Sequence, residues 1–170
     1  MVEQVEFVRA KTSDAAAIST LRHRIWDTTY RGIYPDAVID SFDYDWHQQQ
    51  DLKKISDPSF IVYLIRCGDE DIGYFIFQDT GTGAWLHSLY VLREYQHRGI
   101  GKQAFSILMD YCNEKEISRF ACNCSPHNKN AMRFYQRMGG VVIKTDTGHE
   151  NRQEDGVIFE FNRGIINAKG

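Results

Sequence analysis

Two glycines, Gly99 and Gly101, stand one residue apart where the sequence changes from a strand pattern to a helix pattern. The first turn of a helix carries unpaired N–H groups and a partial positive charge, and glycine lets a ligand approach the backbone closely. Arg98 and Lys102 add positive side chains beside the two glycines. This arrangement predicts an anion site suited to a phosphate or pyrophosphate group.

The residues around the glycine turn bear on three other interpretations of it. A P-loop requires G-x-x-x-x-G-K-[ST], but its first glycine position is Gln96 and the residue after the lysine is Gln103, which excludes it. The dinucleotide pattern G-x-G-x-x-G is weakened because Ala104 replaces the third glycine and four expected strands precede the turn. The third alternative is a helix start whose glycines serve only close packing.

Composition limits the class of protein. The chain has 170 residues, of which 42% are hydrophobic and 25% charged, and this length supports one domain with a buried core. Its formal net charge of −3 lacks the basic surplus typical of nucleic-acid-binding proteins. The longest apolar runs, such as residues 60–65, are too short to span a bilayer, and the N-terminus lacks a secretory-signal pattern. We therefore expect a cytoplasmic protein without nucleic-acid or membrane partners.

The four cysteines are expected to be reduced in that compartment. Cys122 and Cys124 are spaced C-x-C, and a strand would place both side chains on one face. Zinc sites usually space their ligand pairs by two to four residues and need a second pair, which this sequence lacks. The pattern favours buried thiols and predicts no metal.

Hydrophobic periodicity and turn residues divide the chain into alternating elements. Strands are expected at 5–10, 60–66, 72–78, 84–92, 119–124, 141–144 and 157–161, and helices after 12–14 to about 30, from 34–36, and at 43–55, 99–115 and 128–138. This order predicts an α/β fold with a mixed sheet and helices on its faces. One domain is expected over 1–163, followed by a short tail over 164–170.

Two segments carry a family resemblance. LYVLREYQHRGIGKQ resembles motif A of the GNAT family, the acyl-CoA-dependent N-acetyltransferases, whose signature is a strand, [Q/R]-x-x-G-x-[G/A], and a helix. NCSPHNKNAMRFYQRMGG resembles their motif B, N-x-x-A-x-x-F-Y-x-x-x-G after a strand. The matching residues are Gln96, Gly99 and Gly101 in motif A, and Asn128, Ala131, Phe134, Tyr135 and Gly139 in motif B. The family's usual proline after the strand is Arg93 here, and its Gly-Phe is Gly139-Gly140.

The resemblance covers residues 84–140 closely and implies the GNAT fold, a mostly antiparallel sheet of about seven strands flanked by helices on both faces. It implies acetyl-CoA as cosubstrate, held where the strand before motif A splays from the next strand. The residues expected beside it are Leu89, Tyr90, Val91, Gln96, His97, Arg98, Gly99, Ile100, Gly101, Lys102, Asn123 and Asn128. Backbone N–H groups of 97–102 are expected on the pyrophosphate.

The implied reaction is direct attack of an amine on acetyl-CoA, which needs a neutral amine and a proton for the leaving thiolate. Tyr135 is the expected acid, because a phenol pKa of about 10 suits a thiolate; the alternative is a core aromatic beside Phe134. Some family members use a glutamate as base where Trp85 stands here. His87, two residues on, is the candidate base, with a sheet-face histidine as the alternative.

The acceptor side is normally formed by the first two helices and the last hairpin of the family fold. The residues expected there are Trp26, Tyr30 and Tyr34 as walls, and His149 and Glu150, which are also rival bases. Asp27, Glu154 and Asp155 add negative charge for a cationic amine. The resemblance suggests a bacterial small-molecule or polyamine-type member, with a protein amine as another acceptor and a homodimer as a further expectation. The alternative function is a non-catalytic acyl-CoA-binding sensor or assembly module.

Overall fold

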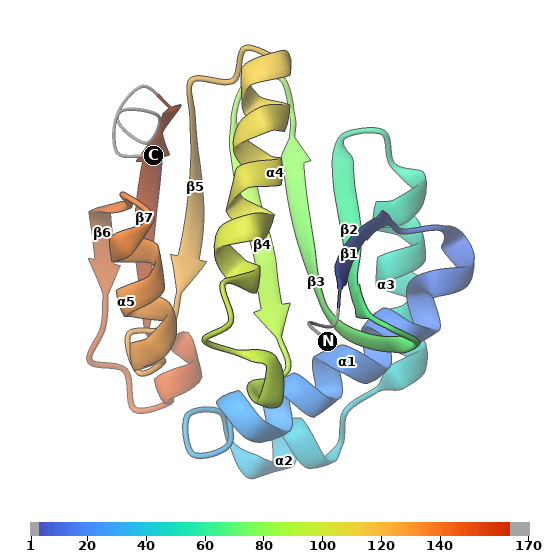
Figure 1. The fold of residues 1–170 in the computed structure, drawn as a ribbon. Helices are drawn as coiled ribbons and strands as arrows, with labels where there is room; N and C mark the ends of the chain where they lie inside the picture. Colours follow the sequence, from blue (N-terminus) through green and yellow to red (C-terminus); the bar gives the residue numbers. More distant parts are fainter. Residues whose placement is uncertain (1–3, 164–170) are drawn as a thin grey trace.

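The computed structural model describes residues 4–163, and its centre is a seven-stranded sheet in the order β1-β2-β3-β4-β5-β7-β6 (Figure 1). The strands are β1 (Val5–Arg9), β2 (Phe60–Cys67), β3 (Glu70–Asp79), β4 (Ala84–Val91), β5 (Arg119–Cys124), β6 (Val141–Asp146) and β7 (Gly156–Asn162). Within the described residues, every neighbouring pair is antiparallel except β4 and β5. This confirms the predicted mixed, mostly antiparallel sheet.

Helices cover both faces of the sheet, as predicted. They are α1 (Ala15–Thr29), α2 (Asp36–Asp40), α3 (Tyr44–Ser56), α4 (Ile100–Glu114) and α5 (Lys129–Arg137). Helices α1 and α3 pack on one face, and α4 and α5 lie on the other (Figure 1). Among residues 4–163, no helix combines the length and apolar character needed to cross a bilayer. The tail expected at 164–170 lies outside the described residues.

Strand β3 explains why the sheet needs helices on both sides. Phe75 and Phe77 pack in the cluster beneath α4, while Tyr74 and Ile76 pack in the cluster beneath α1. Alternating side chains of a strand point to opposite faces, so an apolar run such as residues 72–77 is stable only when both faces are covered. All four of these side chains are at most 1% exposed.

Strands β4 and β5 separate towards the end where α4 begins (Figure 1). They pair only through Trp85 with Ala121 and Leu86 with Cys122. Beyond Leu86, the β5-facing backbone of β4 has no strand partner in the described part of the chain, as the family resemblance implies. Cys122 and Cys124 on β5 are buried free thiols, and burial raises the pKa of both. The separation of the two strands opens the sheet next to the glycine turn.

A buried ion pair joins α1 to α3 on the other face. Arg22 donates to both carboxylate oxygens of Asp51, at 2.7 and 2.9 Å, and the two side chains are 8% and 2% exposed. The Arg22 guanidinium also lies 5.2 Å from the centre of the Tyr74 ring. Removing one partner of such a pair leaves an uncompensated buried charge.

We expect Asp51→Ala to lower the free energy of unfolding by about 3–5 kcal/mol, because Arg22 then stays buried without a counter-ion. The matched control is Asp27→Ala, which removes an exposed carboxylate paired with Arg31 and is expected to change stability by less than about 1 kcal/mol. Urea denaturation of both variants measures the difference. Equal losses in the two variants would contradict the expectation.

Candidate active site

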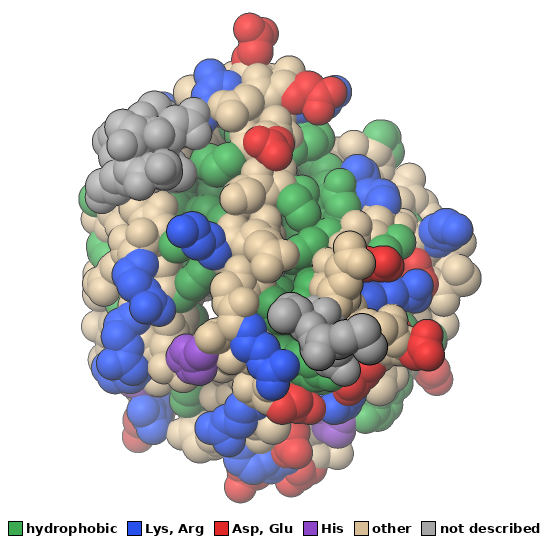
Figure 2. Space-filling view, in the orientation of Figure 1, with side chains coloured by type: hydrophobic (Ala, Val, Ile, Leu, Met, Phe, Trp, Pro, Cys, Tyr) green, Lys and Arg blue, Asp and Glu red, His purple; other side chains and the backbone are tan. Residues whose placement is uncertain are grey.

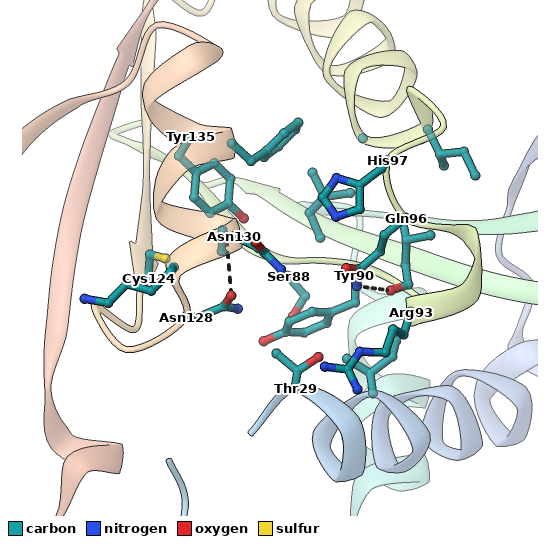
Figure 3. A pocket seen from close by; sticks show the side chains of 18 of the residues that line it. Thr29, Ser88, Tyr90, Arg93, Gln96, His97, Cys124, Asn128, Asn130 and Tyr135 are labelled. Carbon is teal, nitrogen blue, oxygen red and sulfur yellow. Dashed lines mark hydrogen bonds between the residues drawn. The ribbon is translucent and has the colours of Figure 1, made fainter. Parts of the chain in front are cut away.

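A cavity of about 800 Å³ lies between the end of β4, the N-terminus of α4 and the start of α5 (Figure 3). Of the residues predicted for the site, it is lined by Tyr30, His87, Leu89, Tyr90, Val91, Gln96, His97, Gly99, Ile100, Gly101, Lys102, Asn123, Asn128 and Tyr135. Residues from α1, β4, α4, β5 and α5 therefore meet around one hollow. Arg98, Trp26, Tyr34, His149 and Glu150 do not line it.

Glycine is required at positions 99 and 101 of the turn for two different structural reasons. Gly99 is the N-cap of α4 with φ of +80°, and a Cβ placed there would meet no heavy atom within 4 Å. A Cβ on Gly101 would lie 3.0 Å from the ring of Phe134 on α5. Gly99 thus leaves the helix N-terminus open for a ligand, whereas Gly101 permits close packing of the two helices. The interpretation that both glycines serve only packing holds for one of them.

The turn is fixed to the end of β4 by its own polar side chains. The Gln96 side-chain amide donates to the carbonyl of Val91 at 3.0 Å (Figure 3). Arg98 donates to the carbonyl of Glu94 at 2.8 Å, and its guanidinium lies 5.1 Å from the centre of the Tyr95 ring. Arg98 is therefore engaged beside the turn, whereas Lys102 lines the cavity.

Tyr135 is both an aromatic residue of the core and part of the cavity wall. Its ring packs against Phe105, Phe159 and Phe161 and is 8% exposed. Its hydroxyl points into the cavity (Figure 3) and makes no hydrogen bond to another described residue. Burial, with smaller contributions from nearby thiols, raises the pKa of Tyr135 well above its usual value. The phenol is consequently a neutral proton donor held at the cavity wall.

The two predicted asparagines lie on the β5 and α5 side of the gap between β4 and β5. Asn128 is the N-cap of α5, and its side-chain oxygen accepts from the backbone N–H of Ala131 at 3.2 Å. Asn123 lines the cavity from β5 beside Gly156 of β7, where a Cβ would lie 2.6 Å from the Asn123 oxygen. Gly156 therefore makes the room that Asn123 occupies, a requirement that sequence reasoning missed.

Three aromatic side chains from α1, its following loop and β4 form a connected wall. The hydroxyls of Tyr30 and Tyr90 are 3.1 Å apart, and the Tyr30 ring stacks on Tyr34 at 4.4 Å. Trp26 packs edge-on against Tyr34 and Phe42 behind this wall. Tyr30 and Tyr90 thus line the cavity, whereas Trp26 packs against the outer side of this aromatic wall.

His87 lies at an irregularity of the sheet. Phe77 pairs with Leu86 and Ile76 pairs with Ser88, so His87 is an extra residue in β4. Its Nε2 is 2.9 Å from the side-chain oxygen of Gln78, and its ring stacks on Phe60. Burial lowers the pKa of His87. His87 is among the residues that line the cavity, and its ring lies beside Phe60, which packs against the cluster beneath α1, whereas Tyr135 packs in the cluster beneath α4.

A second, shallower cavity of about 650 Å³ lies between the loop after α1 and the β6–β7 loop. Tyr34 and Glu150 line it, and Ile33 lines both cavities. His149 lines neither, and its Nε2 is 2.8 Å from Asp146, which raises the pKa of the imidazole. The structure therefore places Tyr30 at the main cavity and Tyr34 and Glu150 at the second, whereas Trp26 and His149 line neither.

Comparison with known proteins identifies the chain's family. A sequence model described as the acetyltransferase (GNAT) family matches residues 20–140. The chain belongs to this family. It is 24% identical to a spermidine N(1)-acetyltransferase of Thermoplasma acidophilum over 149 residues, covering 84% of this chain and 91% of that protein. It is also 27% identical over 94 residues to an uncharacterized N-acetyltransferase of Lactobacillus delbrueckii subsp. lactis, covering 51% and 54% of the two chains.

Solved acetyltransferase structures share the fold. The PaiA N-acetyltransferase of Thermoplasma acidophilum, solved with coenzyme A, superposes with a TM-score of 0.80 at 21% identity, covering 94% of this chain and 99% of that one. The ribosomal-protein-S18-alanine N-acetyltransferase of Escherichia coli gives 0.70 at 15% identity, covering 94% of each. This GNAT protein is an enzyme that transfers an acetyl group from acetyl-CoA to an amine. The dinucleotide-binding interpretation is wrong, because the dinucleotide-binding fold has a mostly parallel sheet and the sheet of this chain is mostly antiparallel.

Sequence reasoning missed several residues that line the acetyltransferase's main cavity. Arg93, Lys129 and Arg137 add positive charge to it, and His127 joins the lining from the β5–α5 loop. Figure 2 shows Lys and Arg side chains gathered over α5 and beside the start of α4. The i, i+4 spacing of Lys129, Arg133 and Arg137 was the available signal, because it places three cations on one helix face.

Proposed function

We propose that the acceptor of this acetyltransferase is a small cationic amine of the polyamine type. The main observation that supports this proposal is an excess of negative charge beside the second cavity. Arg31 lies 2.6, 3.3 and 2.8 Å from Asp27, Asp36 and Asp40, so one positive charge faces three negative charges and two remain uncompensated. Asp36 also lines that cavity. A surplus of negative charge at a cavity mouth raises the local concentration of cations.

Two further observations support this acceptor class. The aligned Thermoplasma acidophilum relative is named as a spermidine N(1)-acetyltransferase. The second cavity adjoins the first at Ile33, which gives an elongated acceptor room beyond the reacting centre. A polyamine has both the length and the charge that such a site selects.

We propose that acetyl-CoA binds to residues that line the main cavity. Backbone N–H groups at the start of α4, beside Gly99 and Lys102, hold the pyrophosphate, because that helix end is open and positively polarised. The backbone of residues 89–91 pairs with the pantetheine arm where β4 has lost β5 as a partner. Asn123 and Asn128 lie across the same gap.

Acetyl-CoA supplies a thioester carbonyl, and two side chains of this chain handle the protons. Tyr135 donates its phenolic proton to the leaving thiolate, because its raised pKa keeps it protonated. His87 accepts the proton of the acceptor ammonium, directly or through water, because its lowered pKa keeps it neutral at pH 7. The buried aromatic wall of Tyr30 and Tyr90 limits water at the reacting centre.

We expect His87→Ala to lower kcat/KM at pH 7 by about 100-fold or more, as for loss of a general base. Only the neutral imidazole is active, and its pKa lies below 6.5, so wild-type kcat/KM falls only at pH values below that. The variant loses this acidic limb. His149→Ala is the matched control and keeps it. An unchanged pH–rate profile for His87→Ala would make His87 a structural residue.

A thiol-release assay on an amine panel, with mass spectrometry of the products, tests the proposed acceptor. The panel contains spermidine, 1,4-diaminobutane, butylamine, an aminoglycoside and a peptide with a free N-terminus. We expect the polyamines to show the highest kcat/KM, and their advantage over butylamine to shrink as salt screens the acidic rim. A faster reaction with the peptide, or equal rates for spermidine and butylamine at low salt, would contradict the proposal.

A further inference from the structure

The side chain of Arg152, which lies in the β6–β7 loop, contacts two other loops of the chain, the loop after α1 and the β5–α5 loop. Its Nη1 donates to the carbonyl oxygen of Gly32, in the loop after α1, at 3.1 Å. Its Nη2 lies 3.0 Å from Nδ1 of His127, in the β5–α5 loop. Both contacts are exposed, and Arg152 is separated from its partners by 120 and 25 residues. The guanidinium therefore occupies a position built by distant parts of the chain.

The tautomer of His127 follows from its other neighbour. Its Nε2 lies 2.7 Å from a carboxylate oxygen of Asp155, whose side chain is only 5% exposed. A carboxylate only accepts, so Nε2 carries the hydrogen and Nδ1 offers its lone pair to Arg152. The second oxygen of Asp155 accepts from the backbone N–H of His149 at 3.1 Å. The Arg152 guanidinium thus contacts two acceptor atoms, the Gly32 carbonyl oxygen and the His127 Nδ1, and the Asp155 carboxylate holds the His127 ring in place.

This position lies where the two cavities meet. His127 lines the main cavity, whereas Gly32 and Arg152 line the second one. A molecule that extends from the main cavity into the second therefore passes the Gly32 carbonyl and the His127 Nδ1. A primary ammonium has the donors and the charge to satisfy both acceptors in place of the guanidinium.

We propose that Gly32, His127 and Asp155 form a subsite for the second, non-reacting ammonium group of the acceptor, which Arg152 fills in the free enzyme. The reacting amine is neutral when it attacks, but the far amine of a diamine keeps its charge. That far ammonium displaces Arg152, whose exposed side chain leaves without disturbing the core. The inference rests on the proposed function and adds a preference for diamines over monoamines.

Steady-state kinetics with 1,4-diaminobutane and butylamine test the subsite, because these amines differ only in the second amino group. If Arg152 fills the subsite about two-thirds of the time, Arg152→Gln lowers the KM for the diamine about threefold. The KM values for butylamine and acetyl-CoA stay unchanged. Arg119→Gln is the control, since Arg119 is exposed at the far end of β5 and the variant loses the same charge. A rise in KM for both amines would make Arg152 a brace between loops.

Asp155→Asn tests the opposite direction. It removes the charge that backs His127 and frees the ring to change tautomer, so we expect the KM for the diamine to rise about 30-fold or more, from the lower end of the range for truncating a buried charge partner. Butylamine, which has no second ammonium, keeps its KM. Equal losses for the two amines would show that Asp155 only maintains the loop and would overturn the subsite.

A readout independent of turnover separates this inference from the proposed function. Long-range ¹H–¹⁵N spectra of histidine-labelled enzyme report the His127 tautomer, and we expect the form with the hydrogen on Nε2. Diaminobutane, but not butylamine, is expected to shift the Nδ1 resonance, at lower concentration in Arg152→Gln than in wild type. A shift without acetylation of any polyamine contradicts the proposed function alone. Polyamine acetylation without a shift contradicts the subsite alone, and absence of both contradicts both.

Discussion

We expect Tyr135→Phe to lower kcat by about 100- to 10,000-fold, the range for loss of a general acid or base. Phenylalanine keeps the ring that packs against Phe105, Phe159 and Phe161, so the variant loses only the hydroxyl. That hydroxyl makes no hydrogen bond to another residue in the described part of the chain. The free energy of unfolding is therefore expected to stay within about 0.5 kcal/mol of wild type, as for a substitution that removes no contact.

The raised pKa of Tyr135 also predicts how kcat depends on pH. The acid works only while it is protonated, and its pKa lies well above 10, so deprotonation of Tyr135 does not lower kcat at any pH up to about 10. At neutral pH a thiolate that leaves without this proton donor is a poorer leaving group. The deficit of the variant should therefore appear in kcat, with the KM for acetyl-CoA nearly unchanged.

The measurement is the initial rate of thiol release with saturating acetyl-CoA and the best amine of the panel. Tyr111→Phe is the control, because it removes a phenolic hydroxyl from α4 that does not line the cavity. Urea denaturation of both variants checks that folding is intact. If Tyr135→Phe keeps more than half of the wild-type kcat, the thiolate departs without help from Tyr135, and its burial serves the core alone.

Much of the fold was predictable because local signals agree with tertiary structure. The apolar run of β3 needs cover on both faces, and the periodic apolar positions of α1 and α4 supply it. The strands expected at 141–144 and 157–161 are present and pair with each other, with Val142 opposite Phe159. The glycine turn was predictable because a positive φ at Gly99 and close packing at Gly101 both require glycine.

Other features depend on side-chain positions that spacing does not determine. Arg98 stands in the turn but bonds to the Glu94 carbonyl, so charge near a motif does not by itself place a cation in the cavity. The extra residue at His87 shifts the register between β3 and β4, and no glycine or proline at this point of the sequence predicts the shift. The contact between Arg152 and Gly32 spans 120 residues, a separation at which sequence patterns carry no information.

The second large effect is expected at the glycine turn. We expect Gly99→Glu to weaken coenzyme A binding at least 100-fold, since two unit charges about 4 Å apart repel by about 4 kcal/mol at the effective dielectric of a protein surface. A side chain at residue 99 projects into the open space at the N-terminus of α4, where a Cβ meets no other atom within 4 Å. The carboxylate would therefore occupy the space proposed for the pyrophosphate and repel it.

Backbone strain accompanies this substitution, and the chain offers a control that isolates it. Gly81, in the β3–β4 turn, has φ of +83° against +80° at Gly99, and a Cβ there also meets nothing within 4 Å. Gly81→Glu thus carries the same strain, about 1–2 kcal/mol, and the same added charge. Both variants should unfold at similarly lowered temperatures, but only Gly99→Glu should lose the thermal stabilisation that coenzyme A gives to wild type.

Gly99→Gln distinguishes charge from bulk at the same position. Glutamine matches glutamate in size and in backbone strain, so any difference in coenzyme A affinity between the two variants measures repulsion alone. If glutamine binds at least tenfold more tightly than glutamate, and salt narrows the gap, the ligand at this helix end is an anion. If both bind within threefold of wild type, the pyrophosphate lies elsewhere, and Gly99 is glycine only because its φ is positive.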